Sequence, residues 1–200
     1  LQFLYFIGLP LTYQMSANHV IVIGGGLAGC SAAHAAIEHG SNVTLIDKNS
    51  FLGGNSTKAT SGINAAGTVQ QAALGNEDNV KVFMEDATAS YYGNEEKAKG
   101  KPTPATVEVL VKDSAAAIHW LSDTHGLDLS IMGQLGGHSF PRTHRGAEKF
   151  PGMTITYALM EGLEKIEEES GGAKAKIITK ARATELIQEE GVVVGCKYTK

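Results

Sequence analysis

The stretch of sequence that decides the fold is HVIVIGGGLAGCSAAHAAIEHGSNVTLID, residues 19–47. Residues 19–23 form an apolar run of mostly β-branched side chains, which predicts a strand buried on both faces. The small residues of 27–39 predict a helix that stops at Gly40, and 42–47 predicts a second buried strand. A strand, a helix and a strand in so short a span form a βαβ unit with a parallel sheet. We therefore expect an α/β fold.

The turn between the first strand and the helix has the pattern GxGxxG, formed by Gly24, Gly26 and Gly29. Gly24 permits the tight turn, Gly26 lets a pyrophosphate approach the backbone, and Gly29 lets the helix lie close to the strand. The N–H groups at the helix start favour an anion. Asp47, which follows the last glycine by 18 residues, can accept both hydroxyls of a ribose. This context predicts dinucleotide binding, and the alternative is an ordinary strand–turn–helix.

The composition narrows the class of protein. Two hundred residues can bury a core, and 17 basic against 21 acidic residues give a net charge of −4. Nucleic acid and anionic membranes are therefore not expected partners. Cys30 and Cys196 are too few for a disulfide scaffold, a CxxC pair or a Cys-rich zinc site, and we expect no metal site. Cys30, just inside the first helix, is expected to be a buried small apolar side chain rather than a redox group.

Residues 1–18 are interpreted as a leader that precedes one domain over residues 19–200. The apolar run 1–13 is shorter than the ~20 residues of a membrane helix, so no stable membrane insertion is expected. No Lys or Arg precedes Lys48, which argues against an Arg-rich mitochondrial presequence. Residues 1–14 are either a translated leader or assembly artefact, or a degraded targeting segment. We expect a cytoplasmic location, with a mitochondrion or another organelle as the alternative.

The rest of the chain alternates predicted helices with loops. Apolar side chains at helical spacing predict helices over 79–92, 103–126 and 154–169. Thr103 and Pro104 are expected to be the N-cap and the first residue of the second of these helices, which would bury Leu110. A third parallel strand is expected over 176–179, and a hairpin over 184–188 and 192–198. The segments 51–68 and 133–152 show no strand period and are expected to be loops.

The late arrival of the third parallel strand favours a flavin dinucleotide over a nicotinamide one. A long excursion after the second strand is typical of a nucleotide domain that wraps an extended cofactor. The segment 53–64 supplies bare backbone and short hydrogen-bonding side chains, which suit a ribityl chain, a diphosphate and the edge of a flavin ring. The alternative for this segment is a flexible Gly/Ser/Thr loop.

Four stretches carry a resemblance to a known family. They are VIVIGGGLAGCSAA (20–33), LIDK (45–48), GGNSTKATSGINAAGT (53–68) and LGGHSFPRTHR (135–145). Together they resemble the FAD-binding domain of the fumarate reductase/succinate dehydrogenase flavoproteins, and most of all soluble NADH-dependent fumarate reductases. The resemblance runs from about His19 to the end of the chain. It implies a glutathione-reductase-like, Rossmann-type FAD-binding domain with a parallel sheet, incomplete at its C-terminal end and with the capping domain missing.

The resemblance also implies which residues hold the cofactor. The pyrophosphate would lie against Gly24, Gly26, Ala28 and Gly29, and the adenosine ribose would bind Asp47, which Lys48 flanks. The flavin side would be lined by Gly54, Asn55, Ser56, Thr60, Ser61 and Gly62. The backbone near Ala183 would contact adenine. Membrane-bound members tether the flavin through a histidine. Asn55 stands at the matching place, and no histidine occurs from residue 40 to 118. The FAD is therefore expected to be non-covalent.

The function implied is an FAD-dependent oxidoreductase that reduces fumarate to succinate by hydride transfer from reduced flavin. Its expected partners are a small dicarboxylate substrate and an electron donor such as NADH. The alternatives are an aspartate oxidase, ketosteroid dehydrogenase or urocanate reductase of the same family, or a truncated, non-catalytic FAD-binding polypeptide. The family's catalytic arginine and substrate-clamping histidines match no position here, so no catalytic residue is named, and these 200 residues alone are expected to be inactive.

A basic loop, residues 136–145, contains His138, Arg142, His144 and Arg145 in an acidic chain. Such a field would stabilise a dicarboxylate substrate or the electron-rich edge of a flavin. The alternative is that Arg142 and Arg145 pair with acids and fix the loop beneath the flavin.

Overall fold

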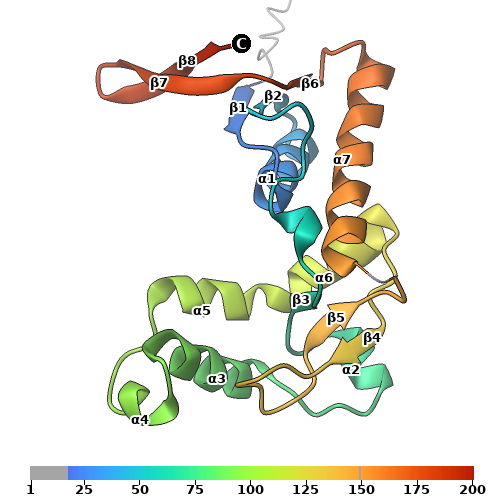
Figure 1. Cartoon of the computed structure of the whole chain (residues 1–200), viewed down its shortest axis with the longest axis vertical. Coiled ribbons are helices and arrows are strands. Elements are labelled where there is room, and N and C mark those ends of the chain that lie inside the picture. Colours follow the sequence, from blue (N-terminus) through green and yellow to red (C-terminus); the bar gives the residue numbers. More distant parts are fainter. Residues whose placement is uncertain (1–17, 149) are drawn as a thin grey trace, which may run out of the picture.

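A computed structural model describes residues 18–148 and 150–200. The leader predicted over 1–18 therefore lies almost entirely outside the described residues. Figure 1 shows a parallel sheet and a long hairpin at one end of the molecule, and a group of helices with a small sheet at the other. The helix α7, Pro151–Ser170, runs along one side of the molecule between these two ends.

The βαβ unit is confirmed. β1 (His19–Ile23), α1 (Leu27–Glu38) and β2 (Asn42–Ile46) follow the predicted order, and β1 and β2 are parallel with His19 opposite Asn42. β6 (Ala175–Ile178) pairs with β2 in parallel, which confirms the late third strand. α1 and α7 pack against each other and against this sheet. The core that results contains Cys30, Ala33, Val43, Leu45, Leu52, Ala65, Ile118, Leu121, Leu129, Ile155, Leu159 and Leu163.

The prediction that β1 is buried on both faces is wrong. The sheet order is β1-β2-β6, so β1 is an edge strand of the sheet formed by the described residues. Val20 and Val22 pack against the core, while Ile21 and Ile23 remain 39% and 51% exposed. These two isoleucines line a cavity of about 320 Å³ shared with the C-terminal hairpin. The second face of β1 is thus only loosely covered.

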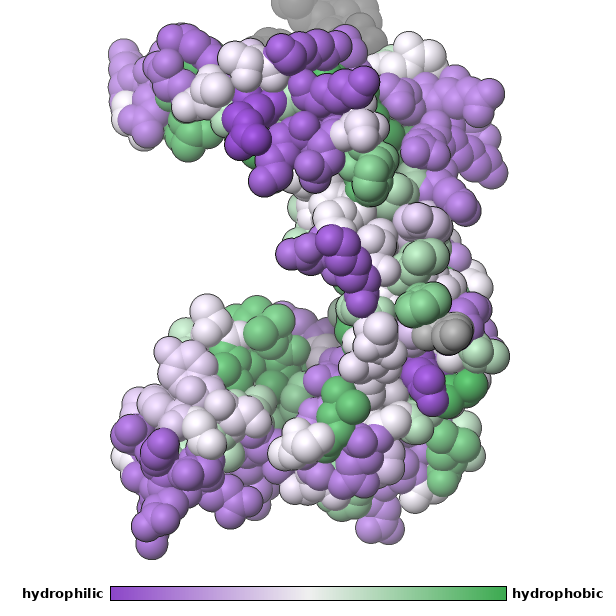
Figure 2. Space-filling view, in the orientation of Figure 1, coloured by the Kyte–Doolittle hydropathy of each residue, from purple (hydrophilic) through white to green (hydrophobic). Residues whose placement is uncertain are grey.

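The C-terminal hairpin is confirmed. β7 (Arg182–Glu189) and β8 (Val192–Thr199) pair antiparallel, with Glu189 opposite Val192. Glu190 and Gly191 between them have φ values of +50° and +82°, which suit a two-residue turn of the kind that matches strand twist. Figure 2 shows the molecule hollowed on one side between this hairpin and the helices at the other end.

The middle of the chain forms short elements that the sequence only partly predicts. They are a 3-10 turn at Ser56–Lys58, β3 (Ile63–Asn64), α2 (Val69–Ala73), α3 (Val80–Tyr92), α4 (Glu95–Ala98), α5 (Ala105–Lys112), α6 (Ser114–His125), β4 (Ile131–Gly133) and β5 (Thr143–Arg145). The three strands form an antiparallel sheet in the order β3-β5-β4. β3 and β5 lie in segments expected to be loops, and β4 directly precedes the second of these segments. Strands of two or three residues are too short to show a period.

The prediction of a single helix over 103–126 is wrong. This segment contains two helices, α5 and α6, which meet at Asp113. At the junction the Ser114 hydroxyl donates to the carbonyl of Val111 (2.8 Å) and accepts from the N–H of Ala66 (3.2 Å). It therefore links the end of α5 to the segment that contains Ala66. Leu110 lies on the exposed side of α5, with 71% of its surface accessible. The N-cap is Pro104 rather than Thr103.

The described residues contain neither a membrane-spanning helix nor a cluster of metal ligands. Within residues 18–148 and 150–200, every helix falls short of the length or the apolar composition that a membrane span requires. In the same part of the chain, no group of three or more His, Cys, Asp or Glu residues is placed to hold a metal ion.

Candidate functional site

The glycine turn between β1 and α1 contains three glycines that the fold requires and one, Gly26, that it does not require. Gly24 has φ +101°, and a Cβ on Gly29 would lie 1.8 Å from the carbonyl oxygen of Gly24. A Cβ on Gly25 would lie 2.3 Å from the side chain of Leu52. A Cβ on Gly26 would meet nothing nearer than 3.6 Å, and the φ of Gly26 is an ordinary −75°. The protein's own packing therefore does not explain the glycine at position 26.

The N-terminus of α1 has the features of an anion site. Its N-cap is Gly26, which supplies no side-chain hydrogen bond, and no acidic residue lies in the first turn. The N–H of Leu27 donates to the Ser56 hydroxyl at 3.1 Å. Ala28, which is exposed, and Gly29 supply further N–H groups of the first turn. These N–H groups and the helix dipole favour a diphosphate in front of Gly26.

Asp47 lies where the sequence predicts a ribose site. It directly follows β2 and is 7% exposed. One carboxylate oxygen accepts from the N–H of Gly25 at 2.8 Å, and the other accepts from the N–H of Asn49 at 2.7 Å. Each oxygen keeps a lone pair for a further donor. The carboxylate is thus held against the glycine turn, and Lys48 beside it is exposed.

A second glycine pair lies beside the first turn. The N–H of Gly53 donates to the carbonyl of Gly25 at 2.7 Å, and Gly26 and Gly53 form an isolated parallel bridge. Gly53 and Gly54 have φ values of +108° and +54°, so this turn also favours glycine. The structure therefore brings Gly54 and Ser56 next to the glycine turn.

Beyond this turn, the predicted flavin-side residues continue towards β3. Asn55, Thr60 and Ser61 are exposed, so their polar groups face away from the protein core. Gly62 has φ +122°, and a Cβ there would lie 2.4 Å from the carbonyl oxygen of His144 in β5. The segment is thus pressed against β5.

The predicted adenine contact comes near the same edge of the sheet. The N–H of Lys180 donates to the carbonyl of Asn49 (2.7 Å), and the N–H of Ala181 to that of Asp47 (2.8 Å). Ala183, two residues further along, lies half-buried in β7 opposite Tyr198. A contact between Ala183 and adenine stays a prediction.

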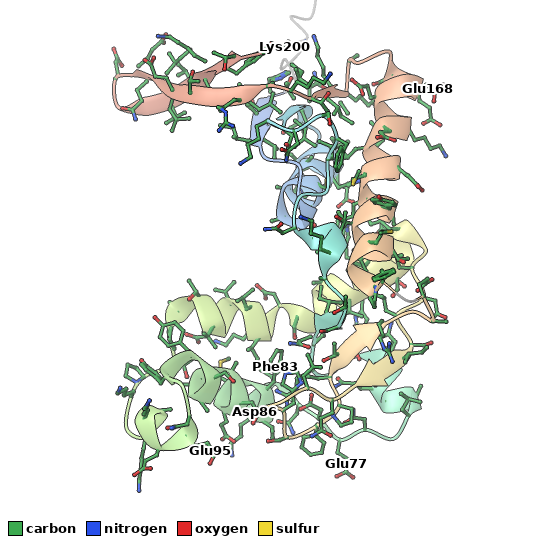
Figure 3. All side chains as sticks on the ribbon, viewed as in Figure 1. Glu77, Phe83, Asp86, Glu95, Glu168 and Lys200 are labelled. Carbon is green, nitrogen blue, oxygen red and sulfur yellow. The ribbon has the colours of Figure 1, made fainter. Side chains whose placement is uncertain are left out.

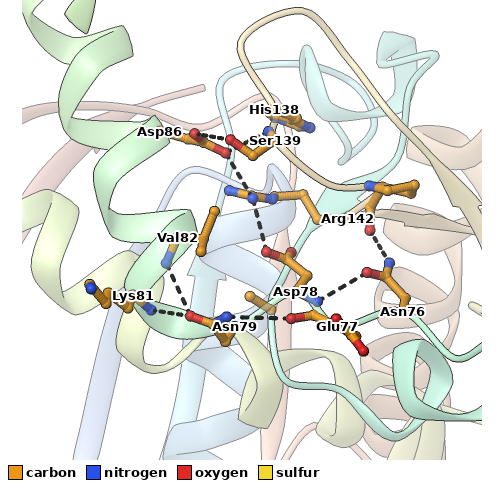
Figure 4. A network of polar contacts seen from close by, with 12 residues as sticks. Asn76, Glu77, Asp78, Asn79, Lys81, Val82, Asp86, His138, Ser139 and Arg142 are labelled. Carbon is orange, nitrogen blue, oxygen red and sulfur yellow. Dashed lines mark hydrogen bonds and ion pairs between the residues drawn. The ribbon is translucent and has the colours of Figure 1, made fainter.

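The two arginines of the basic loop differ in whether they pair with acidic residues. Arg142 is fully buried, and its Nη2 lies 2.9 Å from Asp78 and 2.8 Å from Asp86 (Figure 4). The guanidinium carbon also lies 4.5 Å from the centre of the Phe83 ring. Phe83 and Asp86 both come from α3 (Figure 3). Arg142 therefore pairs with acids and does not face a substrate, whereas Arg145 makes no ion pair among the described residues.

The two histidines of the loop, His138 and His144, do not supply positive charge for a substrate. His144 is fully buried, and burial lowers its pKa below the ordinary value of 6.5. Burial and the charge of Arg142 lower the pKa of His138 in the same way. Both imidazoles are therefore neutral at pH 7.

Three further residues take structural roles, and for Cys30 this confirms the expected buried apolar side chain. Cys30 is fully buried, and burial together with the charge of Asp47 raises the pKa of its thiol to about 11, which keeps it protonated and unreactive. His119 accepts from the N–H of Val69 (3.3 Å), and the Trp120 indole N–H donates to Glu38 (3.0 Å).

Sequence reasoning missed the acidic partners of Arg142. Asp78 lies in the polar stretch 76–79 and Asp86 on α3, both more than 50 residues from Arg142 along the chain. Nothing in the local sequence marks either aspartate, because the pairing depends on how the chain before β5 meets α3 and the residues before it.

Comparisons with known proteins show the family that the chain resembles. A family described as an FAD binding domain matches residues 19–200. The chain is 41% identical over 181 residues to a fumarate reductase of Schizosaccharomyces pombe, covering 88% of this chain and 34% of that protein. It is 38% identical over 186 residues to fumarate reductase 1 of Saccharomyces cerevisiae, covering 92% and 38%. Its fold matches the open conformation of a flavocytochrome c3 fumarate reductase with a TM-score of 0.73 and 34% identity, covering 91% of this chain and 30% of that one. The chain thus spans about a third of the length of these relatives.

Proposed function

The chain belongs to the family of FAD binding domains, and from this premise we propose that it forms the flavin-holding part of a fumarate reductase. One observation supports the cofactor site more than any other: Gly26 is unexplained by packing, yet it caps the helix that faces the Asp47 carboxylate. The reaction is supported by the identity to two yeast fumarate reductases. Residues 19–200 would then be an FAD-binding domain that is incomplete without a capping domain.

The residues present fit FAD in chemical kind. The first turn of α1, with Gly24, Gly26, Ala28 and Gly29, would hold the diphosphate, and Asp47 would accept the ribose hydroxyls. The flavin side would be lined by Gly54, Asn55, Ser56, Thr60, Ser61 and Gly62. When bound and reduced, FAD supplies the hydride that converts fumarate into succinate. The task of this chain is to bind and orient that cofactor, and the residues that grip the dicarboxylate would lie outside these 200 residues.

We also propose a non-covalent flavin, an electron donor such as NADH and a cytoplasmic location. The non-covalent link is supported by Asn55, an exposed amide with no nucleophilic nitrogen, at the place of the tethering histidine. Acid precipitation of the yellow protein tests it: the flavin should stay in the supernatant. Yellow colour in the pellet would contradict a non-covalent flavin.

The reaction is tested with the full-length protein under anaerobic conditions. With NADH or a reduced dye as donor, we expect oxidation of the donor on addition of fumarate and one succinate formed per two electrons. Urocanate and a 3-ketosteroid are the comparison substrates. A flavin-loaded protein that reduces or oxidises one of these and leaves fumarate unchanged would contradict the assignment.

A further inference from the structure

Five buried residues beneath the predicted flavin-side segment form a closed ring of hydrogen bonds. They are Thr68, Gln71, Asp78, Arg142 and His144, none more than 6% exposed. They come from three regions: the N-cap of α2 with its first turns, the approach to α3, and the basic loop with β5. Figure 4 shows the Asp78–Arg142 side of this ring.

The direction of each bond around His144 follows from the chemistry of its partners. Nδ1 of His144 lies 2.8 Å from the carbonyl oxygen of Arg142, which can only accept, so Nδ1 carries the proton. The imidazole is neutral because burial lowers its pKa. Nε2 is therefore an acceptor, and the Thr68 hydroxyl at 2.7 Å donates to it. His144 thus joins the backbone of Arg142 to the N-cap of α2.

The other side of the ring returns to the same arginine. Thr68 and Gln71 form a capping box, with the Gln71 N–H donating to the Thr68 hydroxyl (3.1 Å) and the Thr68 N–H to the Gln71 amide oxygen (3.2 Å). Nε2 of Gln71 then donates to one oxygen of Asp78 (3.0 Å), and Nη2 of Arg142 donates to the other (2.9 Å). The ring closes through the arginine's own main chain.

The ring holds the strand on which the predicted flavin-side residues rest. Asn64 and Ile63 of β3 pair with Thr143 and His144 of β5, and the Thr143 hydroxyl donates to the Asn64 side chain at 2.8 Å. Gly62 approaches so closely that a Cβ would lie 2.4 Å from the His144 carbonyl. A shift of β5 must therefore be passed on to residues 60–62.

We propose that Thr68, Gln71, Asp78, Arg142 and His144 are positioning residues for the flavin: the ring fixes β5, and β5 fixes the segment 60–64. None of the five is expected to touch the cofactor. The proposal rests on the proposed function, because it assumes that residues 60–62 face the flavin.

The test compares Thr68→Val with Thr68→Ser in the full-length protein. Valine has the shape of threonine but no hydroxyl, so it opens the ring, whereas serine keeps the donor to His144. We expect Thr68→Val to raise the Kd for FAD about tenfold and to change the visible circular dichroism of the bound flavin. Thr68→Ser should stay within about twofold of the unsubstituted protein.

A second pair of variants separates positioning from general stability. Leu163→Ala opens a cavity in the core between α1 and α7, away from the ring, and should lower the melting temperature while leaving the Kd for FAD and the flavin spectrum unchanged. His144→Asn keeps a donor to the Arg142 carbonyl and loses the acceptor for Thr68, so it serves if Thr68→Val does not fold. The proposal is overturned if the ring variants lower the melting temperature but bind FAD like Thr68→Ser. Failure of the unsubstituted protein to bind FAD would instead overturn the proposed function.

Discussion

The glycine turn and the Arg142 ring lie at the two ends of the predicted cofactor site and are built in opposite ways. The turn consists of backbone, with glycines where a side chain would strike the carbonyl of Gly24 or the side chain of Leu52. The ring consists of long polar side chains that reach across from segments far apart in the chain. The turn is therefore damaged by added atoms, whereas the ring is damaged by removed ones.

The largest effect is expected from an added atom in the turn. Gly29→Ala places a Cβ 1.8 Å from the carbonyl oxygen of Gly24, and neither backbone can move without separating α1 from β1. We expect the largest loss of folding stability here, above the ~1–3 kcal/mol that is usual for overpacking, because only backbone can yield. Circular dichroism and thermal melting are the measurements.

Gly136→Ala is the matched control, because a Cβ there meets nothing within 4 Å and its φ lies outside the left-handed range. It should melt like the unsubstituted protein. A folded Gly29→Ala protein with normal stability would show that the helix does not lie on the turn as described.

The next effect comes from atoms removed from the ring. Arg142→Met leaves the buried Asp78 and the nearly buried Asp86 without their cation, which should cost ~3–5 kcal/mol of the free energy of unfolding. Urea unfolding measures this loss. Lys112→Met removes a lysine from an exposed ion pair with Glu108 and should change nothing measurable. Equal unfolding curves for the two variants would show that the ion pairs of Arg142 do not stabilise the fold.

The smallest effect concerns pH. Burial lowers the pKa values of His125, His138 and His144 below the ordinary 6.5, so the unfolded chain binds more protons than the folded one between the folded pKa and about 6.5. The free energy of unfolding should therefore be highest above pH 7 and should fall on acidification through this window, by at most ~1.4 kcal/mol per pH unit and group.

His125→Phe sharpens the pH comparison. It removes one of these three groups and leaves the ring intact, so the loss of the free energy of unfolding between pH 7.5 and pH 5.5, measured by urea unfolding, should become smaller. The rings of His34 and His125 meet edge-on with 4.5 Å between ring centres, and the charge of Glu38 acts on the same cluster. An unchanged pH dependence would mean that His125 is not held neutral by the fold.

The two regions also differ in how far the sequence predicts them. The glycine turn and Asp47 could be placed in advance, because a βαβ unit brings the ends of its strands to one edge and the glycine spacing marks the close contacts. The late strand β6 and the hairpin were equally clear from their apolar runs and turn residues. The exposed face of β1 could not be predicted, because an apolar run does not show whether a strand lies in the middle or at the edge of its sheet.

The ring could not be predicted, because it joins side chains up to 76 positions apart through strands of two or three residues. The sequence identified Arg142 and His144 as a cluster of cations but could not find Asp78 or Gln71. Sequence reasoning nevertheless left open that Arg142 pairs with acids, and the structure shows this pairing.

The central claim is that the FAD diphosphate lies in front of Gly26, and Gly26→Ala tests it most directly. A Cβ there meets only ordinary contacts, 3.6 Å from the Ser56 hydroxyl and 3.8 Å from the Gly53 carbonyl, so the melting temperature without FAD should change by no more than about 2 °C. The methyl group would occupy the surface on which the diphosphate rests, and the Kd for FAD measured by titration should rise about tenfold or more. A Gly26→Ala protein that melts normally and binds FAD as tightly as before would contradict the account.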